Sequence, residues 1–119
     1  MKSLLEIQNL VFQEYKNNDY LEEWTFKPYK SINSYKGINS SEQKIYDIAE
    51  LGLIMTEISE AIEEIRKKET DLNKLGLECA DIIIRTLNFM SRKCIIAEYF
   101  IISKNSVNEK RKKLHGKGV

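Results

Sequence analysis

Apolar residues recur every three or four positions through most of this 119-residue chain, which holds a single proline, Pro28, and only 5 glycines. Because an α-helix has 3.6 residues per turn, side chains spaced in this way fall on one face of a helix. Proline and glycine are the residues least compatible with helix interiors. The pattern predicts an all-α fold, a four-helix bundle-like domain that occupies the whole chain, residues 1–119.

The chain divides into four expected segments. These are an N-terminal helix over 1–23, an aromatic and turn-rich loop over 24–41, a helical core over 42–113 and a short tail over 114–119. Within the core, the second helix is expected to end at about Lys68 and the third at about Arg92. The fourth is expected to run from about Ile95 to Lys113. Ser40 and Gln43 form a capping-box pattern before the second helix, and Thr70-Asp71 predicts the start of the third.

The apolar positions predict which helix faces are buried. On the first helix they are Leu4, Ile7, Leu10, Val11 and Tyr15, and on the second Ile48, Leu51, Met55, Ile58, Ile62 and Ile65. The third helix is apolar over most of its circumference and is expected to be central and mainly buried, through Ala80, Ile82, Ile83, Ile84, Leu87, Phe89 and Met90. Four short helices cannot cover this much apolar surface, so we expect a homodimer or a homotetramer.

Composition excludes several classes of protein. Lys plus Arg number 19 and Asp plus Glu 18, so net charge favours no particular partner. No apolar run reaches the 18 or so residues of a membrane span, and the first residues are not typical of a signal peptide, which predicts a cytoplasmic protein without membrane contact. Cys79 and Cys94 lie among apolar residues and are expected to be buried free thiols. With one His, a zinc site is not expected.

Two acidic pairs stand within the helical pattern, Glu57-Ile-Ser-Glu60 and Glu78-Cys-Ala-Asp81. Spacing of i,i+3 places both carboxylates of a pair on one helix face. Two such helices packed antiparallel would aim four carboxylates at one point, a set of hard oxygen ligands that suits Mg²⁺ or Mn²⁺. The alternative is an ordinary solvated face, but neither Glu57 nor Glu60 has a lysine or arginine four residues on.

The third and fourth helices carry further polar stripes. On the third helix the stripe is Glu78, Asp81, Arg85, Asn88 and Arg92. An Asp81–Arg85 salt bridge would explain Arg85 but would leave Glu78 and Asn88 without a purpose. On the fourth helix Lys104, Asn108 and Arg111 share a face and suit phosphate and sugar oxygens. A basic helix end favoured by the helix dipole, or a nucleic-acid-binding tail, are the alternatives for these residues.

Taken together, these motifs resemble the MazG-like all-α nucleoside triphosphate pyrophosphohydrolases over about Glu50 to Lys117. The matching blocks are Glu57-x-x-Glu60, Glu60-Ala-Ile-Glu63-Glu64-Ile-Arg66, Glu78-x-Ala-Asp81-Ile-Ile-Ile-Arg85 and Lys104-x-x-x-Asn108-x-x-Arg111-x-x-x-His115-Gly116-Lys117. Relatives often carry Asp where this chain has Asn88. The N-terminal helix and the aromatic loop match poorly, so the choice of base does not transfer.

The resemblance implies Mg²⁺-dependent cleavage of a nucleoside triphosphate to the monophosphate and pyrophosphate, in a dimer or tetramer. By position, Glu57, Glu60, Glu78 and Asp81 would hold the metal, and Glu57 or Glu60 would serve as general base. The substrate would be contacted by Arg85, Asn88, Lys104, Asn108, Arg111, His115 and Lys117.

Other interpretations remain open. The loop aromatics Trp24, Phe26, Tyr29 and Tyr35 are candidates for stacking on the base or closing over it, and core packing or a partner interface is the alternative. A di-iron four-helix protein would need Glu-x-x-His motifs, which this chain lacks. The main alternative to an enzyme is a non-catalytic helical module that binds a protein or nucleic acid through its basic C-terminal tail, although nucleic acid is the less favoured partner.

Overall fold

The computed structural model describes residues 1–17 and 41–115, with side chains as far as Arg111, and all regular structure in these ranges is helical. The helices are α1 (Leu4–Asn17), α2 (Ser41–Arg66), α3 (Leu72–Arg92) and α4 (Ala97–His115). The all-α expectation is confirmed. No helix in the described ranges is long and apolar enough to cross a membrane. The expected cap at Ser40, the helix end at 18–23 and the loop aromatics lie outside the described residues.

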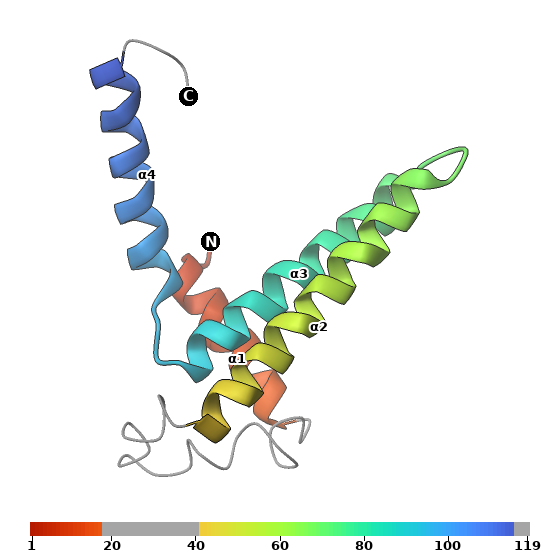
Figure 1. The fold of residues 1–119 in the computed structure, drawn as a ribbon, viewed down its shortest axis with the longest axis horizontal. Coiled ribbons are helices and arrows are strands. Elements are labelled where there is room, and N and C mark those ends of the chain that lie inside the picture. The colour runs from red at the N-terminus through yellow and green to blue at the C-terminus, as the bar shows by residue number, and fades with distance from the viewer. Residues whose placement is uncertain (18–40, 116–119) are drawn as a thin grey trace.

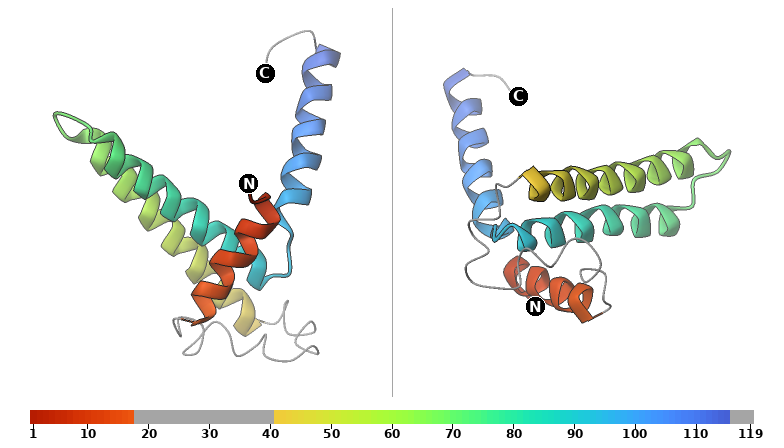
Figure 2. Two further views of the ribbon diagram at one scale, coloured as in Figure 1. Left: turned by 180° about the vertical axis from the view of Figure 1, so that it is seen from behind. Right: turned by 60° about the horizontal axis from the view of Figure 1, so that its bottom comes forward.

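Helices α2 and α3 form a long antiparallel hairpin, and α1 crosses α3 near the open end of that hairpin (Figures 1 and 2). Helix α4 begins beside α1 and then extends away from the α2–α3 hairpin. In all three views, α4 and the hairpin point in different directions. The structure is therefore four helices but not a closed four-helix bundle within one chain.

Side-chain caps fix two of the helix starts. At α1, Ser3 N–H donates to Glu6 Oε1 and Glu6 N–H donates to Ser3 Oγ, both at 3.1 Å, which is a reciprocal capping box. At α3, Asp71 Oδ1 accepts from the N–H groups of Asn73 at 2.9 Å and Lys74 at 3.3 Å. The prediction that Asp71 caps the third helix is confirmed.

The predicted inward face of the second helix is wrong for a single chain. All six of its residues are exposed, from 43% for Ile58 to 70% for Ile48. The residues of α2 that are buried instead are Gln43, Glu50, Ile54, Ala61 and Glu64. Their spacing is also helical, and this polar-rich face packs on α3, whereas the apolar face lies roughly a quarter turn away and is left uncovered.

Other burial predictions are also corrected. Ile83 and Ile84 of α3 are 57% and 38% exposed, and Ile7 and Leu10 of α1 are 38% and 55% exposed. Cys79 and Cys94 are free but exposed, so the expectation of buried thiols is wrong. In each case, the apolar environment inferred from sequence is not supplied by one chain.

Candidate functional site

Three carboxylates meet on one side of the α2–α3 hairpin. Glu57, Glu60 and Glu78 each place an oxygen so that the three atoms lie within 4.8 Å of one another. Glu57 and Glu60 lie one turn apart on α2, and the antiparallel packing brings Glu78 of α3 opposite them. We call these three residues the acidic triad. Like charges at this distance repel, so a bound cation or proton would stabilise the group.

Glu78 is the half-buried member that α3 contributes to the acidic triad. Burial raises the pKa of the Glu78 carboxyl, and the close approach of Glu60, then the charges of Asp81 and Glu57, raise it further. Its Oε2 is enclosed and accepts no hydrogen bond from the described residues. Buried polar atoms are normally paired, so an enclosed oxygen without a partner among the described residues is a candidate position for a proton or a cation.

Asp81, the fourth expected ligand, lies outside this close group. Its side chain is exposed, one turn along α3 from Glu78. The two carboxylates are nevertheless near enough for the Asp81 charge to raise the pKa of Glu78. The structure therefore brings together three of the four predicted metal ligands and leaves Asp81 at their edge.

Arg85 lies against the acidic triad. Its Nε donates to Glu57 Oε1 at 2.9 Å, with the Arg85 side chain 43% exposed and that of Glu57 12% exposed. The alternative salt bridge to Asp81 is not found in the described structure, since the guanidinium reaches across to α2 instead. Glu57 thus has a cationic partner that i,i+4 spacing along α2 did not reveal.

A second ionic cluster stabilises the open end of the hairpin. Arg92, with no exposed side-chain surface, donates from Nε to Glu50 Oε2 at 2.6 Å and from Nη2 to Asp47 Oδ1 at 2.8 Å. Lys93 Nζ lies 2.6 Å from the other Asp47 oxygen. Glu50, which the sequence placed on the same acidic stripe as Glu57 and Glu60, is therefore a partner of Arg92 and not a member of the acidic triad.

The pKa values in this second cluster move in opposite directions. Burial raises the pKa of Glu50 despite the charge of Arg92 and its hydrogen bond. For Asp47, burial acts upward, but hydrogen bonds from Lys93, Gln43 and Arg92 together lower the pKa below its ordinary value. The charge-assisted hydrogen bonds of this cluster hold α2 against the end of α3, so its role is structural.

The predicted phosphate-binding residues of α4 do not reach the acidic triad within one chain. Lys104, Asn108 and Arg111 are all exposed. No hydrogen bond or ion pair among the described residues joins them to the acidic triad, and α4 diverges from the hairpin (Figure 1). Lys104 and Asn108 instead line a shallow depression on α4 with Phe100, Ile101 and Asn105.

The remaining predicted site residues fall in three places. Asn88 is only 5% exposed, and its Oδ1 accepts no hydrogen bond from residues 1–17 or 41–111. Trp24 and Lys117 lie outside the described residues. For His115 the structure gives the helical backbone alone.

Sequence reasoning missed three polar residues with long-range partners, Gln8, Asp47 and Lys93. Gln8 occupies the centre of the apolar stripe of α1, between Leu4 and Val11, yet it is 2% exposed. An amide at the centre of an apolar stripe is the signal that would have identified it, because a buried amide requires hydrogen-bond partners. Asp47 stands one turn before Glu50, and only the packing of α3 shows that both face Arg92.

Comparisons of the chain with models of protein families, with curated proteins and with solved structures found no match.

Proposed function

We propose that this chain is a MazG-like, Mg²⁺-dependent nucleoside triphosphate pyrophosphohydrolase acting in the cytoplasm. It would cleave a ribo- or deoxyribonucleoside triphosphate to the monophosphate and pyrophosphate. The observation that carries the proposal is the acidic triad, three carboxylates within 4.8 Å of one another on two helices. The resemblance of the sequence blocks supplies the reaction, and the geometry supports the part of it that concerns the metal.

The acidic triad suits Mg²⁺, with Mn²⁺ as the alternative ion. Both ions prefer oxygen ligands, and the triad offers carboxylates alone. The unpaired Glu78 Oε2 and the raised pKa of Glu78 indicate negative charge that the described protein leaves uncompensated. When bound, the ion would supply Lewis-acid polarisation of phosphate oxygens and a more acidic water.

The chain's own residues take the following proposed roles. Glu57, Glu60 and Glu78 hold the ion, with Asp81 as the nearest further carboxylate. A triad oxygen of Glu57 or Glu60 that the ion leaves free accepts the proton of the attacking water. Arg85, whose side chain is 43% exposed, would exchange its Glu57 contact for the phosphates.

The other substrate-binding assignments are supported by sequence alone. Lys104, Asn108 and Arg111 would neutralise phosphate charge. Trp24, His115 and Lys117 keep their proposed contacts with the substrate. Asn88 keeps its proposed place beside the substrate on sequence grounds, although it is only 5% exposed.

Uncovered apolar surface supports a homodimer or homotetramer as the active form. Beyond the α2 face described above, the exposed apolar residues at and just before α4 are Ile96 in the α3–α4 connection and, on α4 itself, Tyr99, Phe100, Ile101, Ile102 and Val107, each at least 45% exposed. Faces of this size on a single chain favour association. A second copy packed on them would also provide a route for Lys104, Asn108 and Arg111 to reach an acidic triad, since one chain keeps them apart.

The decisive experiment replaces Glu60 by Gln, which removes one triad charge while keeping the side-chain shape. Turnover of a panel of nucleoside triphosphates, followed as pyrophosphate release with Mg²⁺, should fall by at least about a hundredfold. Glu63→Gln is the matched control, because Glu63 lies on α2, is exposed and pairs with Arg66 only at the surface. Full activity in Glu60→Gln, or equal losses in both variants, would show that the triad assignment is wrong.

The basic outer surface of α4 favours one competing function, a non-catalytic binding module. Lys104, Lys110 and Arg111 are exposed and, within the described residues, form no ion pair with an acidic side chain. Such a module would show no Mg²⁺-dependent turnover with any nucleotide. Its affinity for an anionic partner would fall steeply with salt, so a salt series separates the two functions.

A further inference from the structure

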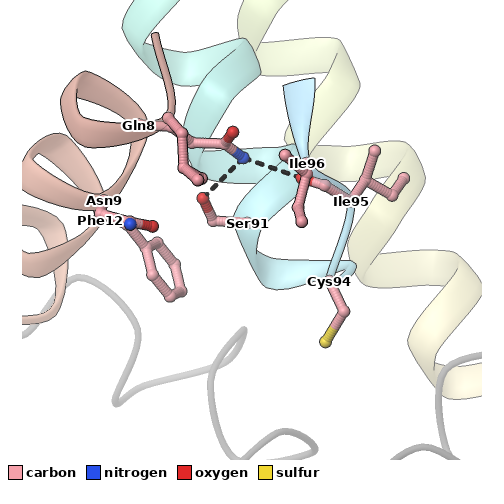
Figure 3. A pocket seen from close by; sticks show the side chains of 8 residues that line it. Gln8, Asn9, Phe12, Ser91, Cys94, Ile95 and Ile96 are labelled. Carbon is pink, nitrogen blue, oxygen red and sulfur yellow. Dashed lines mark hydrogen bonds between the residues drawn. The ribbon is translucent and has the colours of Figure 1, made fainter. Parts of the chain in front are cut away.

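Gln8 joins three elements of the fold. Its Nε2 donates to Ile95 O at 2.8 Å, to Ser91 Oγ at 3.0 Å and, at the longer distance of 3.5 Å, to Leu87 O. Its Oε1 accepts from the N–H of Ala97 at 2.9 Å. Figure 3 shows the amide of Gln8 pointing from α1 toward the end of α3 and the start of α4. One side chain therefore contacts α3, the α3–α4 connection and the first residue of α4.

The α3–α4 connection depends on such a partner because it is short and turns sharply. Cys94 has φ of 61°, a left-handed conformation that is uncommon for a residue other than glycine. The turn leaves the partly buried carbonyl of Ile95 and the buried N–H of Ala97 facing α1. Backbone groups shielded from water in this way need hydrogen-bond partners, and the two ends of one amide satisfy both.

Little else within the described chain fixes the direction of α4. Ala97 is fully buried, but the residues of α4 from Tyr99 to Arg111 are all exposed. Among the described residues, α4 packs mainly against α1, close to its first turn (Figure 2). A helix held at one end is oriented by the contacts at that end, and Gln8 is central among them.

We propose that Gln8 is the residue that sets the direction in which α4 leaves the helical body. Its amide N–H group donates to the carbonyl of Ile95 and its amide oxygen accepts from the N–H of Ala97. Together these two hydrogen bonds hold both backbone groups at a fixed position relative to α1. Gln8 would thereby act as a positioning residue for Lys104, Asn108 and Arg111. This last step rests on the proposed function, because it assumes that these three residues bind the substrate.

The test is the orientation of α4 in the full chain, measured by residual dipolar couplings in Gln8→Leu. Leucine fills a similar volume but offers neither donor nor acceptor. In the wild type, one alignment tensor should fit α2, α3 and α4 together. In Gln8→Leu, the couplings of α2 and α3 should keep that fit while those of α4 depart from it, and amide exchange at Ala97 should accelerate by on the order of tenfold.

Gln13→Leu is the matched control, since Gln13 is an exposed glutamine on the same helix whose amide bonds the neighbouring side chain of Asn17 at 3.1 Å and, within the described residues, no other helix. It should leave the orientation of α4 and the exchange of Ala97 unchanged. If Gln8→Leu fails to fold, Gln8→Met, an unbranched side chain of similar length with no N–H to donate to Ile95 O, takes its place, and α4 should again depart from the common tensor. A single tensor in a folded Gln8 variant would overturn the proposal.

Activity measurements separate this proposal from the function on which its consequence rests. Because the acidic triad lies on α2 and α3, Gln8→Leu should keep the Mg²⁺ affinity of the wild type while KM for the nucleotide rises. Loss of Mg²⁺ affinity as well would indicate general unfolding and overturn a positioning role. If the wild type turns over no nucleotide, the proposed function fails, whereas the couplings still decide whether Gln8 directs α4.

Discussion

Arg85 Nε lies 2.9 Å from Glu57 Oε1, so an arginine of α3 already neutralises part of the acidic triad on α2. The guanidinium and a bound cation would compete for the same carboxylate. Exposed or partly exposed ion pairs contribute little to stability, typically below about 1 kcal/mol. The contact can therefore be exchanged for others at small cost, which is the property expected of a group that moves between carboxylate and phosphate.

Replacing Arg85 by Met should strengthen Mg²⁺ binding and weaken turnover. Without its guanidinium, the triad is more negative, and affinity for the ion should rise by up to about fivefold, the equivalent of one partly exposed ion pair. Isothermal titration with Mg²⁺ or Mn²⁺ checks the first effect, and pyrophosphate release checks the second. Arg66→Met, at an exposed pair far along α2, is the control. Weaker ion binding in Arg85→Met would contradict competition for Glu57.

The raised pKa of Glu78 predicts how the stability of the metal-free protein varies with pH. A carboxyl whose pKa is raised by folding binds its proton more tightly in the folded state, so its contribution is present below the ordinary value of 4.5 and is lost as pH rises through the raised pKa. The Glu78→Gln variant has no ionisable carboxyl at this position, so it does not lose this stabilisation as pH rises. Its melting temperature relative to the wild type should therefore rise as pH increases from about 4 to 7.

Mg²⁺ should reverse that difference at neutral pH, because it stabilises the wild-type triad more than the variant. Differential scanning fluorimetry over pH, with and without Mg²⁺, measures both effects, and Glu63→Gln serves as the control. A melting-temperature difference between Glu78→Gln and wild type that does not change with pH would show that the Glu78 pKa is not perturbed by folding.

Removing Arg92 should destabilise the fold severely. Arg92→Met leaves the carboxylates of Glu50 and Asp47 without the buried guanidinium, and breaking a buried pair in this way typically costs about 3–5 kcal/mol. Urea denaturation measures the loss. Arg92→Met combined with Glu50→Gln should recover part of it, because one uncompensated charge is then removed. A loss as small as that of Arg66→Met, within about 0.5 kcal/mol, would refute a structural role.

The apolar face of α2 should prove to be an interface between copies. Ile62 is 48% exposed in one chain, and Ile62→Asp would place a charge within a buried contact. Light scattering should show the variant as a monomer of about 14 kDa and the wild type as a dimer or tetramer. Thr56→Asp, exposed on α2 away from this face, should leave the assembly intact. A monomeric wild type with full activity would refute the interface.

The positions of the helices could be predicted from local sequence patterns, namely apolar periodicity and capping residues. Periodicity located α2 and α3, and Asp71 was identified as a cap because its carboxylate accepts from the first free N–H groups of α3. The i,i+3 spacing of Glu57 and Glu60 likewise required no tertiary information, because helix geometry alone places them on one face. Their meeting with Glu78 needed only the further assumption of an antiparallel hairpin.

The sequence by itself determined the helical class, most helix limits within a few residues and the identity of the acidic residues, because these depend on neighbours three or four positions away. Tertiary packing alone decided which face of α2 meets α3, that Glu50 pairs with Arg92 while Glu57 pairs with Arg85, and that Gln8 holds the start of α4. These contacts join residues from 28 to 89 positions apart. Periodicity gives the faces of a helix but contains no information on which partner, in this chain or a second copy, covers each one.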